Sequence, residues 1–283
     1  MFFTKMHGAG NNYVYVNGFK EKIRNRPAFS RQVSDIHFGI GSDGLIVIDP
    51  SEVADCKMDI YNADGSQAMM CGNGVRCVAK FAYDNGIATK DEITVETLSG
   101  IKTIKVRAAG GKVVEATVNM GAPILRPADI PAITPDPENP AVAIPVFVDG
   151  QDWHATLVSM GNPHCVVYMG DLYGTFDIEK TGPKFEFDPM FPQRVNTEFI
   201  RVIDRNTLEM RVWERGSGET FACGTGACAA TVASILNGYC DKDEDIIVHL
   251  RGGDLTIRWS GEDNNVYMTG GAETICTGEI EEK

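Results

Sequence analysis

The chain has 283 residues, of which 43% are hydrophobic, enough for a buried core and for about two domains. It carries 39 Asp and Glu against 26 Lys and Arg, a net charge of -13. This balance argues against nucleic acid and anionic membranes as partners, because both need a basic surface. No apolar run approaches the length of a membrane span, and the N-terminus lacks the hydrophobic segment of a secretion signal, so we expect a cytoplasmic protein.

The first half of the chain predicts two glycine loops and two helices among short strands. A polar, glycine-rich loop is expected at 5–12 and a second one at 39–44, and Pro27 begins a helix that runs to about Phe38. Residues 75–84 repeat apolar side chains at helical spacing, and Asn85-Gly86 is typical of a helix C-cap. Strands are predicted at 13–16, 45–48, 58–61, 93–97, 101–106 and 113–120.

The second half begins with a proline-rich stretch, residues 121–145, which excludes a regular helix or a central strand. We interpret it as a crossover between two domains. A helix from Ala227 to about Leu236 is apolar or small nearly all round, which is typical of a helix buried on every side. Residues 171–194 are expected to be irregular and the acidic end, 279–283, to be solvated. Strands are predicted at 143–148, 153–159, 165–168, 198–203, 207–213, 246–250, 255–259 and 266–269.

The eight cysteines contain no Cys-x-x-Cys pair, and this spacing argues against a zinc ribbon and against a thioredoxin-like site. Without a secretion signal they indicate free thiols, and most are expected to be small core residues. One of them, Cys71, precedes the turn Gly72-Asn73-Gly74 and the helical pattern after it. A helix that begins there directs its unpaired N–H groups and its positive dipole end at a ligand, and it favours ionisation of a nearby thiol.

The stretch around Cys71 is repeated later in the chain. Residues 58–86 align with 210–238 at an offset of 152 residues and without a gap, so that Cys71 matches Cys223 and Asn85-Gly86 matches Asn237-Gly238. Each copy reads strand, polar turn, Cys-Gly-x-Gly, helix, Asn-Gly. Chance is a poor explanation, and we infer a duplication into two similar domains, each with one cysteine at a helix start.

Two helix N-termini that face each other would bind one carboxylate strongly. Two thiols on opposite sides of the adjacent carbon could then invert it, since one thiolate removes the α-proton and the other thiol delivers a proton to the opposite face. The oriented N–H groups would stabilise the negative charge that develops on the carboxylate. The pair would titrate as a coupled unit. This pattern predicts a racemase or epimerase.

The sequence resembles the diaminopimelate epimerase family over nearly its whole length. Proline racemases share the architecture but carry His after the first Cys-Gly, where this chain has Asn73. The motifs that carry the resemblance are Lys5-Met6-His7-Gly8-x-Gly10-Asn11, Asn62-x-Asp64-Gly65-Ser66, Cys71-Gly72-Asn73-Gly74-x-Arg76-Cys77, Met160-Gly161-Asn162-Pro163-His164 and Trp213-Glu214-Arg215-Gly216-x-Gly218-Glu219-Thr220-x-Ala222-Cys223-Gly224-Thr225-Gly226.

The resemblance implies an α+β fold of two pseudo-symmetric domains, each a β-barrel-like sheet around a central helix. We expect an N-terminal domain of residues 1–120 with 270–283, and a C-terminal domain of residues 121–269. The implied reaction converts LL-diaminopimelate to the meso form for lysine and peptidoglycan precursors. The resemblance further implies that neither a metal nor another cofactor such as PLP is used, that the substrate is a diamino dicarboxylate and that the protein is a homodimer.

The resemblance also assigns the site. Cys71 and Cys223 are the acid–base pair, and Gly44 and His164 are possible neighbours of the site. Some relatives carry Gln where this chain has Gly44, so one side-chain contact to the distal end of the substrate is missing or replaced. The expected carboxylate-binding backbone amides and substrate-binding side chains belong to Gly72, Asn73, Gly224 and Thr225, and to Asn11, Asn62, Asn162, Asn196, Glu214 and Arg215.

Three alternatives stay open at this point. The first is a racemase of the same fold that acts on another amino acid, histidine or proline. The second is a redox protein in which Cys71 and Cys223 cycle through a disulfide. The third is a small-molecule binder without catalytic activity.

Overall fold

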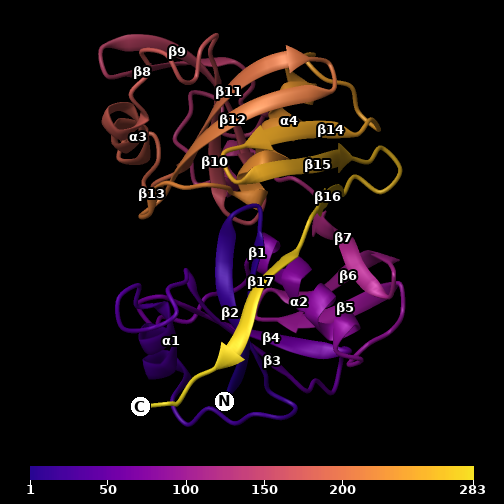
Figure 1. The fold of residues 1–283 in the computed structure, drawn as a ribbon. Coiled ribbons are helices and arrows are strands. Elements are labelled where there is room, and N and C mark those ends of the chain that lie inside the picture. The colour runs from indigo at the N-terminus through magenta and orange to yellow at the C-terminus, as the bar shows by residue number, and fades with distance from the viewer. The chain divides into compact units, whose positions relative to one another are not determined.

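The computed structural model describes all residues, 1–283, and separates into two compact units. Unit 1 consists of Met1–Asn119 and Thr269–Lys283, and unit 2 of Met120–Met268. In Figure 1 unit 1 is coloured from indigo to magenta, with the yellow C-terminal strand added to it, and unit 2 continues through orange. The proline-rich stretch 121–145 belongs to unit 2, where it contributes Ile130 and Ala141 to the core.

Unit 1 is one curled sheet with two helices. Its strands pair in the order β17-β1-β2-β3-β4-β5-β6-β7; β2 and β3 are parallel, as are β4 and β5, and the remaining pairs are antiparallel. The elements are β1 (Phe2–Gly8), β2 (Asn11–Asn17), α1 (Arg26–Ser34), β3 (Gly44–Asp49), β4 (Cys56–Asn62), α2 (Gly72–Asp84), β5 (Glu92–Thr97), β6 (Gly100–Ala109), β7 (Lys112–Gly121) and β17 (Glu273–Glu279).

Unit 2 repeats this plan. Its strands pair in the order β8-β9-β10-β11-β12-β14-β15, and the parallel pairs are again the third and the fifth. The elements are the 3-10 turn η1 (Pro127–Asp129), β8 (Ile144–Val148), β9 (Gln151–Ser159), β10 (Pro163–Tyr168), α3 (Ile178–Glu186), β11 (Asn196–Asp204), β12 (Thr207–Glu214), β13 (Gly218–Glu219), α4 (Gly224–Leu236), β14 (Ile246–Leu250), β15 (Gly253–Trp259) and β16 (Val266–Gly270).

Each unit wraps its sheet around one central helix. Helix α2 contacts strands β1 to β6, and α4 contacts the equivalent strands of unit 2, from β9 to β15. Figure 1 shows α4 behind β14 and β15. Ten of the thirteen residues of each helix are buried, which confirms the expected burial of α4. The shared pairing order and the central helices confirm the predicted α+β fold with two similar barrel-like sheets.

Side chains alternate across each sheet and thereby select which residues reach the central helix. In unit 1, Val14 and Leu45 pack on the α1 side, whereas Tyr15 faces α2 and its hydroxyl lies 3.4 Å from the carbonyl oxygen of Gly74. In unit 2, Cys165 and Phe199 pack towards the core that contains α3. Their neighbours along each strand therefore point to α4.

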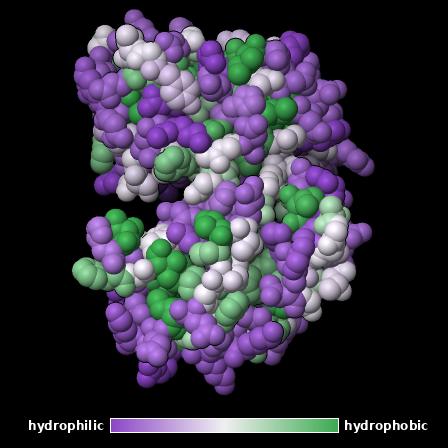
Figure 2. Space-filling view, viewed as in Figure 1, coloured by the Kyte–Doolittle hydropathy of each residue, from purple (hydrophilic) through white to green (hydrophobic).

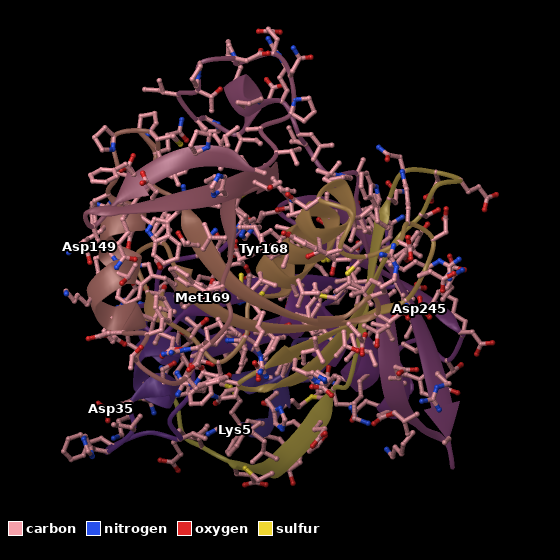
Figure 3. The ribbon with its side chains drawn as sticks, turned by 90° about the horizontal axis from the view of Figure 1, so that it is seen from above. Lys5, Asp35, Asp149, Tyr168, Met169 and Asp245 are labelled. Atoms are coloured by element: carbon pink, nitrogen blue, oxygen red, sulfur yellow. The ribbon has the colours of Figure 1, made fainter.

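Helix α1 is shorter than predicted. It ends at Ser34 because Asp35 adopts an extended backbone, and the Asp35 carboxylate accepts the N–H groups of His37 and Phe38 at 2.7 Å. Figure 3 labels Asp35, the residue that directly follows α1. The side chain of Phe38 is 84% exposed instead of covering the core. Figure 2 shows that hydrophobic residues reach the surface of unit 1.

Residues 171–194 are not irregular throughout, because they contain α3. Asp177 caps this helix by accepting the N–H of Lys180 at 3.1 Å. The internal Gly182-Pro183 has a low helix propensity, so the sequence alone does not indicate a helix here. Packing stabilises it, since the ring of Phe185 meets that of Phe199 edge to face with 5.7 Å between their centroids.

The N-terminal loop was predicted incorrectly, and the expected solvation of 279–283 holds for Glu279, Glu281 and Lys283 but not for the rest of the tail. Residues 5–8 lie in β1, so the first glycine loop is only the turn between β1 and β2. The unpredicted strand β17 pairs with β1, and the Met1 amino group donates to the carbonyl oxygen of Ile280 at 2.9 Å. The tail is anchored beyond that point, because Glu282 accepts the backbone N–H groups of Arg24 and Asn25. No helix is long and apolar enough to cross a membrane.

Candidate active site

Cys71 is the N-cap of α2. Its backbone is extended (φ -134°, ψ 119°), and its sulfur accepts the N–H of Gly74 at 3.4 Å. The first intrahelical hydrogen bond runs from Val75 N to Cys71 O. The N–H groups of Gly72 and Asn73 precede it, which leaves them directed at whatever lies before the helix.

Asn11, at the start of β2, reaches this cysteine. The Cys71 thiol donates to Asn11 Oδ1 at 3.2 Å, and Asn11 Nδ2 donates to Asp43 at 2.9 Å, so the amide is held in one orientation. Tyr13 lies two residues further along β2 and is buried. Burial, and then the negative charges of Cys71 and Asp43, raise the pKa of its phenol, which keeps this group protonated beside the cysteine.

The other predicted site residues of unit 1 are Asn62, Asn73 and Gly44, and each has different contacts. Asn62 lies at the end of β4 and donates to Ser66 Oγ at 2.9 Å within the turn. The side chain of Asn73 is buried and accepts from the guanidinium of Arg76, so only its backbone N–H is available to a ligand. At Gly44 a Cβ would lie 2.1 Å from the carbonyl oxygen of Tyr61. This backbone therefore has no room for a side chain at position 44.

Cys223 is the N-cap of α4 and repeats the backbone of Cys71. Its sulfur accepts the N–H of Gly226 at 3.4 Å and lies 3.4 Å from Thr225 Oγ1. The N–H groups of Gly224 and Thr225 again precede the first intrahelical bond, which runs from Ala227 N to Cys223 O. Burial, followed by the charges of Glu214 and Glu198, raises the pKa of the Cys223 thiol well above its ordinary value.

Glu214 ends β12 and lies next to Cys223, with which it shares a side-chain hydrogen bond. Thr220 Oγ1 donates to its Oε1 at 2.5 Å. Burial raises the pKa of this carboxyl group, although the hydrogen bonds from Thr220 and Cys223 oppose the shift. A carboxyl group beside a buried thiol can exchange a proton with it.

Asn162 and His164 form a hydrogen-bonded chain with the same cysteine. Asn162 Nδ2 donates to Thr225 Oγ1 at 3.3 Å, and Asn162 Oδ1 lies 3.0 Å from Nε2 of His164. The other ring nitrogen of His164 lies 2.7 Å from Glu198, and both of these side chains are fully buried. His164 thus contacts the network around Cys223 and not the solvent.

Asn196, the first residue of β11, and Arg215, in the turn after β12, lie beside this network. Asn196 is buried, donates to the carbonyl oxygen of Pro163 at 3.0 Å and accepts the N–H of Arg215 at 2.9 Å, so its amide holds two backbone segments. The guanidinium of Arg215 is exposed and donates through Nη1 to the carbonyl oxygen of Gln193. Its other N–H groups donate to no acceptor within the chain and can bind an anion.

Three residues near the site were missed from the sequence. Arg76 is fully buried in α2 and binds the carbonyl oxygen of Gly271 at 3.3 Å. Glu186 of α3 accepts the indole N–H of Trp213 at 2.8 Å and the N–H of Gly216 at 2.9 Å, which fixes the loop that carries Arg215. The sequence predicts Glu198 only as the first residue of a strand, 198–203. Its signal was a carboxylate within the otherwise uncharged run 195–200.

No group of three or more His, Cys, Asp or Glu side chains is arranged to hold a metal ion. Both half-sites instead offer a thiol and unpaired backbone N–H groups at a helix start. Such a pair of features binds a carboxylate and places an acid or a base beside it.

Comparison with known proteins agrees with this chemistry. The sequence model of a family described as "Diaminopimelate epimerase" matches residues 3–125 and 156–275. Proteins named diaminopimelate epimerase are 54% identical in Agathobacter rectalis (99% of both chains) and 50% identical in Methanococcus maripaludis (99% of this chain and 100% of the relative).

Solved structures share the fold at low identity. A phenazine biosynthesis protein of the PhzF family from Bacillus anthracis superposes with a TM-score of 0.72 at 16% identity, covering 100% of this chain and 99% of its own. A probable proline racemase from Agrobacterium radiobacter also reaches 0.72, at 13% identity, covering 100% and 93%. At such low identity these structures show a shared fold alone. The matches to the family model and to the sequence relatives, in contrast, extend over most of the chain, and the chain therefore belongs to the diaminopimelate epimerase family.

Proposed function

We propose that the chain is an isomerase that converts LL-diaminopimelate to meso-diaminopimelate through Cys71 and Cys223, as a step of lysine and peptidoglycan precursor biosynthesis. The family supports the reaction and the substrate. The observation that carries the mechanism is the equivalence of the two half-sites, each with a cysteine N-cap and two unpaired N–H groups.

In this proposal the N–H groups of Gly72, Asn73, Gly224 and Thr225 bind the carboxylate at the reacting carbon. One sulfur removes the α-proton, and the other sulfur gives a proton to the opposite face. Charge that develops on the carboxylate is stabilised by donors that need no reorganisation. The reaction therefore needs one thiolate and one thiol at a time.

The electrostatics favour Cys223 as the thiol in the resting enzyme. Its burial and the neighbouring Glu214 and Glu198 all disfavour a negative charge on the sulfur. Cys71 then takes the proton from the substrate and Cys223 gives one up. Before the next turnover Cys71 must lose a proton and Cys223 must gain one, and Glu214 is placed to pass that proton to Cys223.

The remaining predicted residues bind the rest of the substrate. Arg215 is the natural partner for the distal carboxylate, because a guanidinium forms two parallel hydrogen bonds with a carboxylate. Asn11, Asn62 and Asn162 bind the amino groups or orient them, and Asn196 positions the Arg215 loop through its backbone contacts. A cytoplasmic location and a homodimer stay predictions.

The test is turnover of LL-diaminopimelate by the purified protein, with histidine and proline as competing substrates under the same conditions. We expect meso-diaminopimelate as the product and no turnover of the other two amino acids. Faster turnover of histidine or proline would contradict the substrate assignment and leave the two-thiol mechanism in place.

A further inference from the structure

Unit 2 contains a buried carboxylate–imidazole pair whose hydrogen bonds have no role in the proposed proton transfer. Glu198 in β11 and His164 in β10 have no exposed side-chain surface, and Glu198 Oε1 lies 2.7 Å from His164 Nδ1. A carboxylate removed from water is costly unless a partner compensates for it. A pair of this kind therefore needs a reason to persist in the core.

The pair lies directly beneath the first turn of α4. A Cβ at Gly226 would lie 2.6 Å from Glu198 Oε1, so the carboxylate touches the helix one turn from Cys223. The positive end of the helix dipole favours a negative charge at this place. Only one carboxylate oxygen is engaged, because Oε2 is buried without a hydrogen-bond partner.

A continuous set of contacts connects Glu198 to the cysteine. His164 Nε2 lies 3.0 Å from Asn162 Oδ1, Asn162 Nδ2 donates to Thr225 Oγ1, and Thr225 Oγ1 lies 3.4 Å from Cys223 Sγ. Each group in this series takes its orientation from the one before it. A carboxylate that accepts the Nδ1 proton fixes the imidazole ring at the start of the series.

Unit 1 shows that the fold itself does not need the carboxylate. Strands β2 and β3 align Tyr15 with Ile46 in the same parallel register in which β10 and β11 align Val166 with Glu198. Ile46 accordingly lies under α2, with its Cδ1 2.9 Å from a Cβ placed at Gly74. An apolar side chain fills the equivalent position in unit 1, so this fold can be built without a carboxylate there.

We propose that Glu198 is a positioning residue: its carboxylate accepts the Nδ1 proton of His164 and so fixes the ring, whose Nε2–H donates to Asn162 Oδ1 and thereby orients Asn162, Thr225 and the Cys223 thiol. This rests on the proposed role of Cys223 as one of the two acid–base groups. Glu198 itself touches neither the substrate nor the sulfur through a hydrogen bond; it acts through His164.

The experiment compares Glu198→Gln and Glu198→Ile with a matched control, Asp59→Asn. Asp59 is also a buried carboxylate in an ion pair, with Arg26, but it lies in unit 1, and its hydrogen bonds go to Arg26 and Gln67. The first readout is NMR of the free enzyme labelled with 15N-histidine, with the His164 signals assigned by their loss in His164→Gln. The second is kcat and KM for diaminopimelate in both directions.

We expect a hydrogen-bonded Nδ1 proton on His164 that exchanges slowly in the native enzyme, shifts upfield in Glu198→Gln and disappears in Glu198→Ile. Glu198→Ile should lower kcat by roughly 10- to 100-fold, the range for losing a hydrogen bond to a charged group, with a much smaller effect on KM. Glu198→Gln should recover part of that loss, and Asp59→Asn should change neither readout.

An unchanged His164 spectrum in Glu198→Gln, or unchanged kcat in both Glu198 variants, would overturn the proposal. If Glu198→Ile does not fold, the Gln variant still gives both results. The NMR readout needs no substrate, so failure of the native enzyme to epimerise diaminopimelate would contradict the proposed function without altering the result for this pair.

Discussion

The two half-sites share their backbone and differ in the charges around the cysteine. Both cysteines are N-caps that accept an N–H three residues ahead at 3.4 Å. At the offset of 152 residues, however, Asn62 corresponds to Glu214 and Ala63 to Arg215. In unit 2, therefore, the carboxylate of Glu214 ends β12 and the exposed guanidinium of Arg215 follows it, whereas in unit 1 an amide and a phenol adjoin Cys71 and the carboxylate of Asp43 lies behind Asn11.

This difference indicates what a duplicated site keeps and what it changes. In the proposed mechanism the reacting carboxylate takes donors from both helices, which explains why the two helix starts stay alike. The substrate has one distal end, and the proton transfer needs one acid and one base at a time. The side chains around the two sulfurs can therefore diverge while the scaffold is retained.

The largest effect should come from removing either sulfur. Cys71→Ala and Cys223→Ala should each lower kcat by roughly 10²- to 10⁴-fold, the range for loss of a general acid or base. The measurement is steady-state epimerisation in both directions. Cys276→Ser, at an exposed position in β17, serves as the control and should retain full activity. Full activity in either alanine variant would show that the two half-sites are not both catalytic.

Arg215 tests whether only unit 2 binds the distal carboxylate. Arg215→Ala should raise KM by roughly 10- to 100-fold, because a hydrogen bond to a charged group is lost, and Arg215→Lys should restore part of the affinity. Arg107→Ala provides an exposed arginine of unit 1 as the control. An unchanged KM in Arg215→Ala would remove the guanidinium from the binding site.

Alanine substitutions at the two helix-start glycines, Gly74 and Gly226, test the comparison through the free energy of unfolding. In Gly226→Ala the new methyl group would meet the fixed carboxylate of Glu198, whereas in Gly74→Ala it would meet the movable Cδ1 of Ile46. Overpacking of this kind costs about 1–3 kcal/mol, and we expect the larger loss at Gly226. Urea unfolding of both variants gives the two free energies, and a larger loss at Gly74 would contradict the account.

The smallest effect concerns the charge next to Cys223. Because a negative charge at Glu214 raises the pKa of the Cys223 thiol, Glu214→Gln should favour the thiolate and move its alkylation profile to lower pH. Mass spectrometry can follow carbamidomethylation of Cys223 against pH in a Cys276→Ser background. The profile of Cys71 should stay in place in the same samples. A shift of the Cys223 profile to higher pH would contradict the electrostatic account.

The sequence predicted those features that local patterns determine. Helical spacing, the Asn-Gly caps and the repeat located both central helices and both cysteines. Helix α3 was missed because Gly182 and Pro183 lower its propensity, and tertiary packing of Phe185 together with capping by Asp177 stabilises it. Strand β17 was missed because its partner, β1, is distant in sequence. Glu198 was missed for a similar reason, since its role depends on strand register and not on its neighbours.

The central claim is that two thiols act on opposite faces of one carbon, and hydrogen exchange in deuterated water tests it most directly. LL-Diaminopimelate is incubated with the enzyme, and both isomers are recovered at low conversion for mass spectrometry. The account predicts deuterium at the inverted carbon of the meso product and protium in the recovered substrate, because the base that removes the proton is not the acid that delivers one. A product that keeps the hydrogen of the substrate would contradict the two-thiol mechanism.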